Sequence, residues 1–243
     1  MDKLVKLTEF TGPAGVPADA KLQGWLRRRR PWLSLLLLVF AVQRLAAAEA
    51  PAEALAAASQ GLPGFLASVP PGDEAMYGFV PGGELTQARL GAPLRLYTIT
   101  PAALAGGRAA VSVGGLLADT TMWYFPVQVG EEVKAMLVVD RMEDGWRAVS
   151  FGYAPLAREW NVIAKQWPAA KGFHPRLAVV FQAQQYWFTV PEVDDRNLTP
   201  VATPGGYGPK AKGGYAALHG LAESVRALQP AVAKAVAEPP RAN

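Results

Sequence analysis

Residues 123–153 carry the strongest periodic pattern in the chain, and the rest of the fold has to accommodate it. Three strand-like segments follow one another there, and the tight-turn pair Asp144-Gly145 separates the second from the third. Turns this short join antiparallel neighbours. We therefore predict a three-strand antiparallel meander over residues 123–153. Its segments are WYFPVQV (123–129), VKAMLVV (133–139) and WRAVSFGY (146–153).

The second segment is apolar on both faces, which predicts that it is the most central strand of the meander. Strict alternation along a strand places Val133 and Ala135 on one face and Lys134 and Met136 on the other.

Residues 155–167 follow the meander directly and change to a helical period. Their apolar residues are spaced by four, three and four positions, and Pro168 closes the segment. This stripe consists of Leu156, Trp160, Ile163 and Trp167. It predicts an amphipathic helix packed on the sheet. With further helices, the expected fold class is α+β, with an antiparallel sheet centred on the meander.

Composition divides the chain into four parts. They are a signal peptide over residues 1–48, an α+β core domain over 49–190, a Pro/Gly-rich loop over 191–214, and an amphipathic helix with a frayed tail over 215–243. Within the core, the Ala-rich segment Ala50–Ser59 predicts a short helix, whereas residues 61–83 are dense in Gly and Pro and predict a loop.

The predicted signal peptide has a basic region, an apolar region and a small-residue site in that order. Its apolar region, residues 31–42, has 12 residues, fewer than the roughly 20 that a membrane-spanning helix needs. We therefore expect cleavage near Ala48 and export to the periplasm or the medium. The alternative is an uncleaved anchor formed by residues 31–48, which the preceding arginines suit. Residues 1–20 make the leader long, so the true start codon stays open.

The basic character of the whole chain comes from this leader. The formal net charge is +4, but residues 1–48 hold eight of the 24 Lys and Arg and three of the 20 Asp and Glu. The remainder therefore carries 16 basic and 17 acidic side chains. Nucleic-acid binding relies on clustered positive charge, so we expect no nucleic-acid partner, and membrane contact only if the signal is uncleaved.

Few residues have the spacing of a catalytic or metal site. The chain has no cysteine, which excludes thiolate metal ligands, disulfides and a cysteine nucleophile. It has no GxSxG elbow, and its two histidines, His174 and His219, favour structural or surface roles while leaving a chemical role open. We accordingly predict no catalytic residue, no metal site and no cofactor.

Aromatic residues concentrate in the meander and its neighbours. Because side chains alternate along a strand, some of these aromatics are expected to face outward and form a contact surface for a protein, peptide or glycan partner. The candidate surface consists of Tyr124, Trp146, Phe151, Tyr153, Tyr186 and Trp187. The alternative is that another helix covers this second face of the sheet.

These patterns favour an exported bacterial protein that acts as a non-catalytic binding or cell-envelope accessory domain. The bacterial source is inferred from the alanine-rich composition and the style of the signal. Two alternatives stay open. One is a secreted or periplasmic hydrolase whose site the motifs do not reveal, and the other is a structural protein tethered to the membrane by an uncleaved N-terminal helix.

Overall fold

The computed structural model describes residues 49–105, 112–201 and 218–237. The predicted signal peptide, residues 1–48, lies outside the described residues. The chain divides into two units, residues 1–46 and 47–243, and every described residue belongs to the second. Among the described residues, no helix is both long and apolar enough to span a lipid bilayer.

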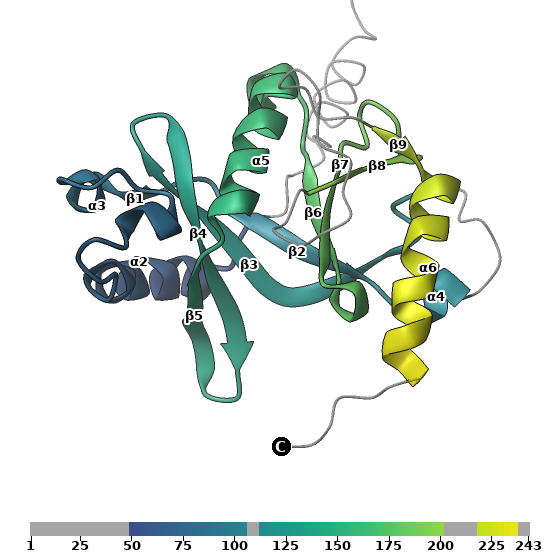
Figure 1. The fold of residues 1–243 in the computed structure, drawn as a ribbon, viewed down its shortest axis with the longest axis horizontal. Coiled ribbons are helices and arrows are strands. Elements are labelled where there is room, and N and C mark those ends of the chain that lie inside the picture. The colour runs from purple at the N-terminus through teal and green to yellow at the C-terminus, as the bar shows by residue number, and fades with distance from the viewer. Residues whose placement is uncertain (1–48, 106–111, 202–217, 238–243) are drawn as a thin grey trace, which may run out of the picture. The chain divides into compact units, whose positions relative to one another are not determined.

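Helices and strands are mixed along the second unit (Figure 1). The helical segments are α2 (Ala52–Ala67), η1 (Glu74–Tyr77), α3 (Glu84–Gln87), α4 (Pro101–Ala105), α5 (Ala154–Gln166), η2 (Ala169–Lys171), η3 (Phe181–Ala183) and α6 (Leu221–Ala237). The strands are β1 (Arg89–Leu90), β2 (Leu94–Ile99), β3 (Leu117–Val129), β4 (Glu132–Met142), β5 (Gly145–Gly152), β6 (Arg176–Val180), β7 (Gln185–Thr189), β8 (Asn197–Pro200) and β9 (His219–Gly220).

The nine strands of the described residues form one sheet in the order β5-β4-β3-β2-β6-β7-β8-β9, and β1 also pairs with β3. Pairing is antiparallel throughout this part of the chain except between β2 and β6, which run parallel. A parallel pair needs a crossover, and here the crossover contains β3, β4, β5 and α5. A large, mostly antiparallel sheet combined with helices confirms the predicted α+β class.

Helix α2 covers one face of β3, β4 and β5. It contacts an apolar cluster of Trp123, Phe125, Val127, Ala135, Leu137 and Val139. Gly61 makes the close approach possible, because a Cβ at this position would overlap the Cβ of Ala148 on β5. The helix therefore continues past the predicted end at Ser59, and it accommodates Pro63 within its last turns. The predicted loop over 61–83 begins only after Ala67.

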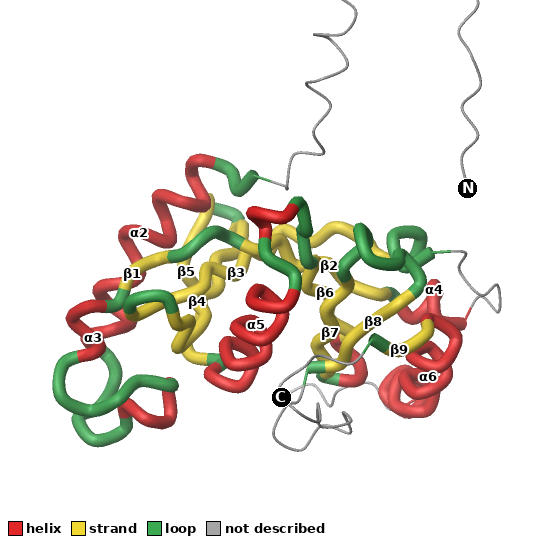
Figure 2. The backbone as a smooth tube through the Cα atoms, turned by 90° about the horizontal axis from the view of Figure 1, so that it is seen from above, coloured by secondary structure: helices red, strands yellow, loops and turns green. Residues whose placement is uncertain are grey.

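Helix α5 covers the opposite face of β3 and β4, so these two strands lie between two helices (Figure 2). Its cluster includes Tyr124, Met136, Val138, Leu156, Ile163 and Trp167. Residues 123–127 are all buried as a result. Trp167 is buried, whereas Trp160 is half-buried and packs against Phe188.

A β-bulge changes the predicted faces at the start of β4. Val127 pairs with Ala135 while the next residue of β3, Gln128, pairs with Val133, so Lys134 is the extra residue. Val133 consequently packs with Met136 in the α5 cluster instead of with Ala135. Strict alternation predicted the wrong face for Val133.

Helices α4 and α6 cover the far end of the sheet. Their cluster includes Ile99, Leu104, Val180, Trp187, Leu198, Leu221 and Leu228. Within the segment predicted as a loop over 191–214, residues Asn197–Pro200 form β8, and residues 202–214 lie outside the described residues. In the predicted C-terminal helical region, α6 begins at Leu221 and continues through Pro230 to Ala237.

Candidate functional site

The six aromatic residues of the predicted surface lie in three different places. Tyr153 and Tyr186 each contact Tyr124, which lies on the α5 face of the sheet. Trp146 and Phe151 pack in the α2 cluster. Trp187 is buried in the cluster beneath α4 and α6. The predicted residues therefore do not form one continuous row.

The three tyrosines form a group that we call the tyrosine cluster. The ring centroid of Tyr124 lies 5.7 Å from that of Tyr153 and 6.1 Å from that of Tyr186, in edge-to-face arrangements. The hydroxyl oxygens of Tyr124 and Tyr186 are 3.0 Å apart and share a hydrogen bond. Ser150 donates from Oγ to the hydroxyl oxygen of Tyr153 at 3.2 Å. Strand β3, strand β7 and the β5–α5 junction thus each contribute one phenol.

The tyrosine cluster extends from the core to the surface. Tyr124 is 1% exposed, Tyr186 is half-buried and Tyr153 is 36% exposed. Tyr153 has φ 56° and ψ 39°, the left-handed conformation that few residues other than glycine adopt. Its carbonyl oxygen accepts the N–H of Ala157 in the first turn of α5. Uncommon backbone conformations of this kind are enriched at binding and catalytic sites.

The environment of the tyrosine cluster raises the pKa of two of its phenols, which are therefore neutral at physiological pH. Burial raises the pKa of Tyr124 well above its ordinary value, and the neighbouring Tyr186 raises it further. Burial also raises the pKa of Tyr186, although its hydrogen bond with Tyr124 acts in the opposite direction. Neutral phenols both donate and accept hydrogen bonds, so the cluster suits an uncharged polar ligand.

The other predicted surface residues are packed among neighbours. Phe151 has ring contacts with Phe65, Tyr77 and Phe79 at centroid distances of 6.0, 5.8 and 6.2 Å. Trp146 is half-buried.

Tyr124 and Trp187 are only 1% and 4% exposed, so the prediction that they face solvent is wrong. The reason is that helices cover both faces of β3 and that α6 covers β7.

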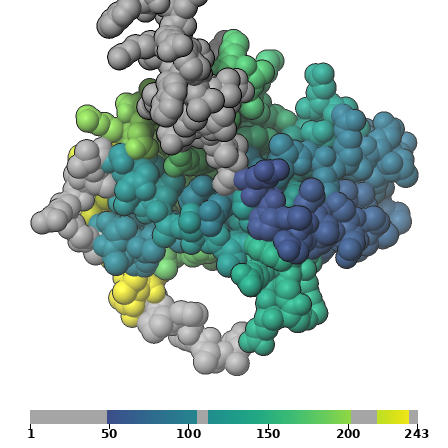
Figure 3. All heavy atoms as spheres, turned by 180° about the vertical axis from the view of Figure 1, so that it is seen from behind, coloured from purple at the N-terminus to yellow at the C-terminus, as the bar shows by residue number. Residues whose placement is uncertain are grey.

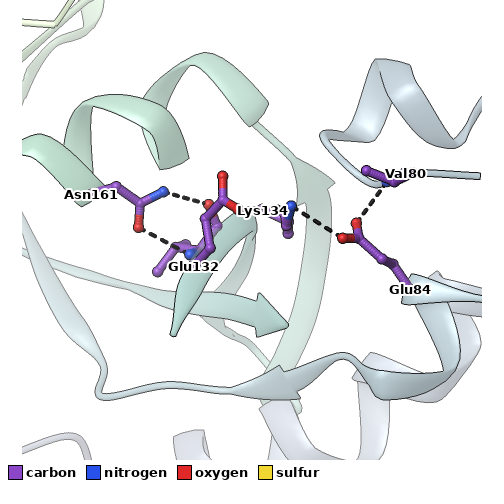
Figure 4. Close-up of polar contacts among 6 residues, drawn as sticks. Val80, Glu84, Glu132, Lys134 and Asn161 are labelled. Atoms are coloured by element: carbon purple, nitrogen blue, oxygen red, sulfur yellow. Dashed lines mark hydrogen bonds and ion pairs between the residues drawn. The ribbon is translucent and has the colours of Figure 1, made fainter. Parts of the chain in front are cut away.

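A polar network holds the β4 bulge in place (Figure 4). Lys134 Nζ lies 3.2 Å from Glu84 and 2.9 Å from Glu132, and its side chain is only 11% exposed. Glu84 also accepts the backbone N–H of Val80 at 2.6 Å. That hydrogen bond, and then Lys134, lower the pKa of Glu84. Hydrogen bonds from Lys134 to Glu132 and Glu84 raise the pKa of the lysine, so Lys134 is a cation and not a nucleophile.

Asn161 on α5 completes this network from the other side. Its Oδ1 accepts the N–H of Val133 at 3.0 Å, and its Nδ2 donates to the carbonyl oxygen of Val133 at 2.8 Å (Figure 4). Both backbone groups of one bulge residue are thereby satisfied by a single side chain. Sequence reasoning missed Lys134 and Asn161, because their roles depend on contacts between distant segments. It also missed Ser150, whose partner Tyr153 is only three residues away, because no motif marks that hydrogen bond.

Each of the two histidines lies beside one glutamate. His219 Nδ1 lies 3.9 Å from Glu223, and the backbone N–H of His174 donates to Glu192 at 3.2 Å. Across the described ranges, neither histidine has a hydrogen bond to a serine. The same ranges contain no group of three or more His, Asp or Glu residues placed to hold a metal ion.

The described residues define an α+β protein with a partly exposed tyrosine cluster beside α5. No protein-family model, curated protein or solved structure matches the chain. Its function therefore has to be inferred from its own residues.

Proposed function

We propose that the chain is an exported bacterial protein whose mature part is a non-catalytic binding or cell-envelope accessory domain. Its contact surface is the accessible part of the tyrosine cluster, Tyr153 and the half-buried Tyr186, with the buried Tyr124 as their support. The partner is a protein, peptide or glycan that presents uncharged polar groups. The observation that carries this function is the hydrogen bond between the buried Tyr124 and the half-buried Tyr186, next to the exposed ring of Tyr153 that packs on Tyr124.

The chemistry of the tyrosine cluster supports binding over catalysis. A nucleophilic hydroxyl needs an adjacent base. In the described part of the chain, the hydrogen bonds of the cluster join phenols to one another and to Ser150, and none reaches a carboxylate or an imidazole. Tyrosine rings instead supply a large apolar contact area together with a polar tip, a combination that is enriched in recognition surfaces.

The frame of this surface is the three-strand meander of residues 123–153 with the amphipathic helix of residues 155–167 packed on it. Tyr124 and Tyr153 both belong to the meander, and Tyr153 lies where it joins α5. Helix α2 covers the opposite face of the meander, so the meander is a rigid support for the tyrosine cluster. A rigid support lowers the entropy lost when a partner binds.

Binding can be tested with soluble peptidoglycan fragments, which carry both sugar and peptide groups. We expect the wild-type chain to bind them in a calorimetric titration and Tyr153→Ala to weaken binding by about tenfold, the effect of losing one aromatic contact. The matched control is Phe181→Ala, which removes an aromatic ring that is 49% exposed outside the tyrosine cluster. Equal affinities for Tyr153→Ala and wild type would contradict a role for the cluster.

A further inference from the structure

A second group of side chains lies on the opposite face of the sheet from the tyrosine cluster. Leu96 packs in the same apolar cluster as Tyr124, so its neighbours Arg95 and Tyr97 point to the other face. The guanidinium carbon of Arg95 lies 5.8 Å from the centroid of the Tyr97 ring. That of Arg176, on the parallel neighbour β6, lies 6.0 Å from the same centroid. Two strands therefore place two cations at one aromatic ring.

Arg95, Tyr97 and Arg176 lie on the part of this sheet face between helices α2 and α6. The α2 cluster reaches Trp123, and the α6 cluster begins at Ile99 on the same face. Arg95, Tyr97 and Arg176 belong to neither cluster and are half-buried. From behind, residues in the colour of the β2 region reach the surface between the purple α2 and the yellow α6 (Figure 3).

The hydrogen-bonding capacity of the two arginines is only partly used. Arg95 Nη2 pairs with Asp119 at 3.2 Å, but its Nε is buried without a hydrogen-bond partner among the described residues. No carboxylate of the described ranges lies within 4.0 Å of the Arg176 guanidinium. A buried or half-buried guanidinium ordinarily has an anionic partner.

We propose that Arg95, Tyr97 and Arg176 form a binding site for the carboxylate group of a ligand. The planar guanidinium of Arg176 presents paired N–H donors that match the two oxygens of a carboxylate. The ring of Tyr97 holds the guanidinium groups by cation–π attraction. Two arginines and one aspartate leave one net positive charge, which a singly charged carboxylate neutralises and a doubly charged phosphate exceeds.

The test is a titration of the ¹⁵N-labelled full chain, followed through the arginine Nε–Hε signals. Sodium acetate is the probe, and sodium phosphate and sodium chloride are compared at equal ionic strength. We expect saturable shifts of the Arg95 and Arg176 signals with acetate and weaker, non-saturating shifts with chloride. Arg176→Gln should reduce the acetate affinity by about tenfold, whereas Arg226→Gln, which changes an exposed residue on α6, should leave it unchanged.

Two results would overturn the site. The first is an equal response of all arginine signals to acetate and chloride, which indicates ionic strength alone. The second is saturation by phosphate at a lower concentration than acetate, which excludes the carboxylate assignment. If Arg176→Gln does not fold, Arg176→Lys gives the same test, because it keeps the charge and loses the paired donors. Unchanged acetate binding in Arg176→Lys would also count against the site.

Discussion

At the scale of single residues, the environment of Tyr124 differs most from that of a tyrosine in water. Its ring is almost fully buried, yet its hydroxyl has a partner in Tyr186. A buried hydroxyl without a partner destabilises the folded state by about 1–3 kcal/mol, so the pairing of two phenols is what makes this position compatible with tyrosine. The same pairing fixes the ring against which the exposed Tyr153 packs.

The raised pKa of Tyr124 predicts that alkaline pH destabilises the protein. In the unfolded chain the phenol ionises near 10.0, whereas in the folded chain it stays neutral to higher pH. The stabilising contribution is fully present below pH 10.0 and is lost as pH rises above it, by about 1.4 kcal/mol per pH unit for each such phenol.

Urea unfolding of wild type and Tyr124→Phe between neutral pH and pH about 11 measures this effect. We expect Tyr124→Phe to be less stable at pH 7 by about 1 kcal/mol, because one hydrogen bond is lost. Its stability should then decline less steeply above pH 10 than that of wild type. Parallel declines would show that Tyr124 ionises as readily in the folded chain as in the unfolded chain.

At the scale of elements, the bulge in β4 ties three segments together. Lys134 pairs with Glu84 from α3, Asn161 from α5 bonds to Val133, and Gly78 lies so close to the Lys134 carbonyl oxygen that a Cβ would overlap it. Gly78 also has φ 91°, which favours glycine. The loop before α3, the meander and α5 are therefore positioned by one irregular residue pair.

Asn161→Ala tests this role of the bulge. The substitution removes both hydrogen bonds to Val133 and leaves a buried N–H and C=O without partners, so we expect a loss of about 2 kcal/mol in the free energy of unfolding measured with urea. Lys165→Ala, an exposed position on the same helix, is the control and should change stability by less than about 0.5 kcal/mol. Equal effects of the two substitutions would indicate that Asn161 does not support the bulge.

At the scale of the whole molecule, three helices pack on different parts of one sheet. Helices α2 and α5 pack on opposite faces of β3 and β4, and α6 packs on β7 and β8. The part of β2 around Tyr97 lies between α2 and α6. This arrangement separates the tyrosine cluster from the arginine pair by the thickness of the sheet. The two proposed sites therefore lie on different surfaces of the protein.

The sequence predicted what depends on local periodicity. The alternation in residues 123–153 and the helical stripe after it were sufficient for the α+β class. Pairing between distant segments has no local signal, which is why the parallel β2–β6 pair and the contact between Tyr124 and Tyr186 were not predicted. The extension of α2 through Pro63 was missed for a related reason, since its packing on β5 outweighs the low helix propensity of proline.

Export is the central claim about the whole chain, and the N-terminus of the mature protein tests it most directly. Cells producing the full chain are fractionated, and the N-terminal peptide in each fraction is identified by mass spectrometry. We predict a protein that begins near Glu49 in the periplasm or the medium, and retention of the leader in an Ala48→Tyr variant, because the cleavage site requires small residues. A protein that begins at Met1 and stays in the cytosol would contradict export, and one that begins at Met1 in the membrane fraction would contradict cleavage.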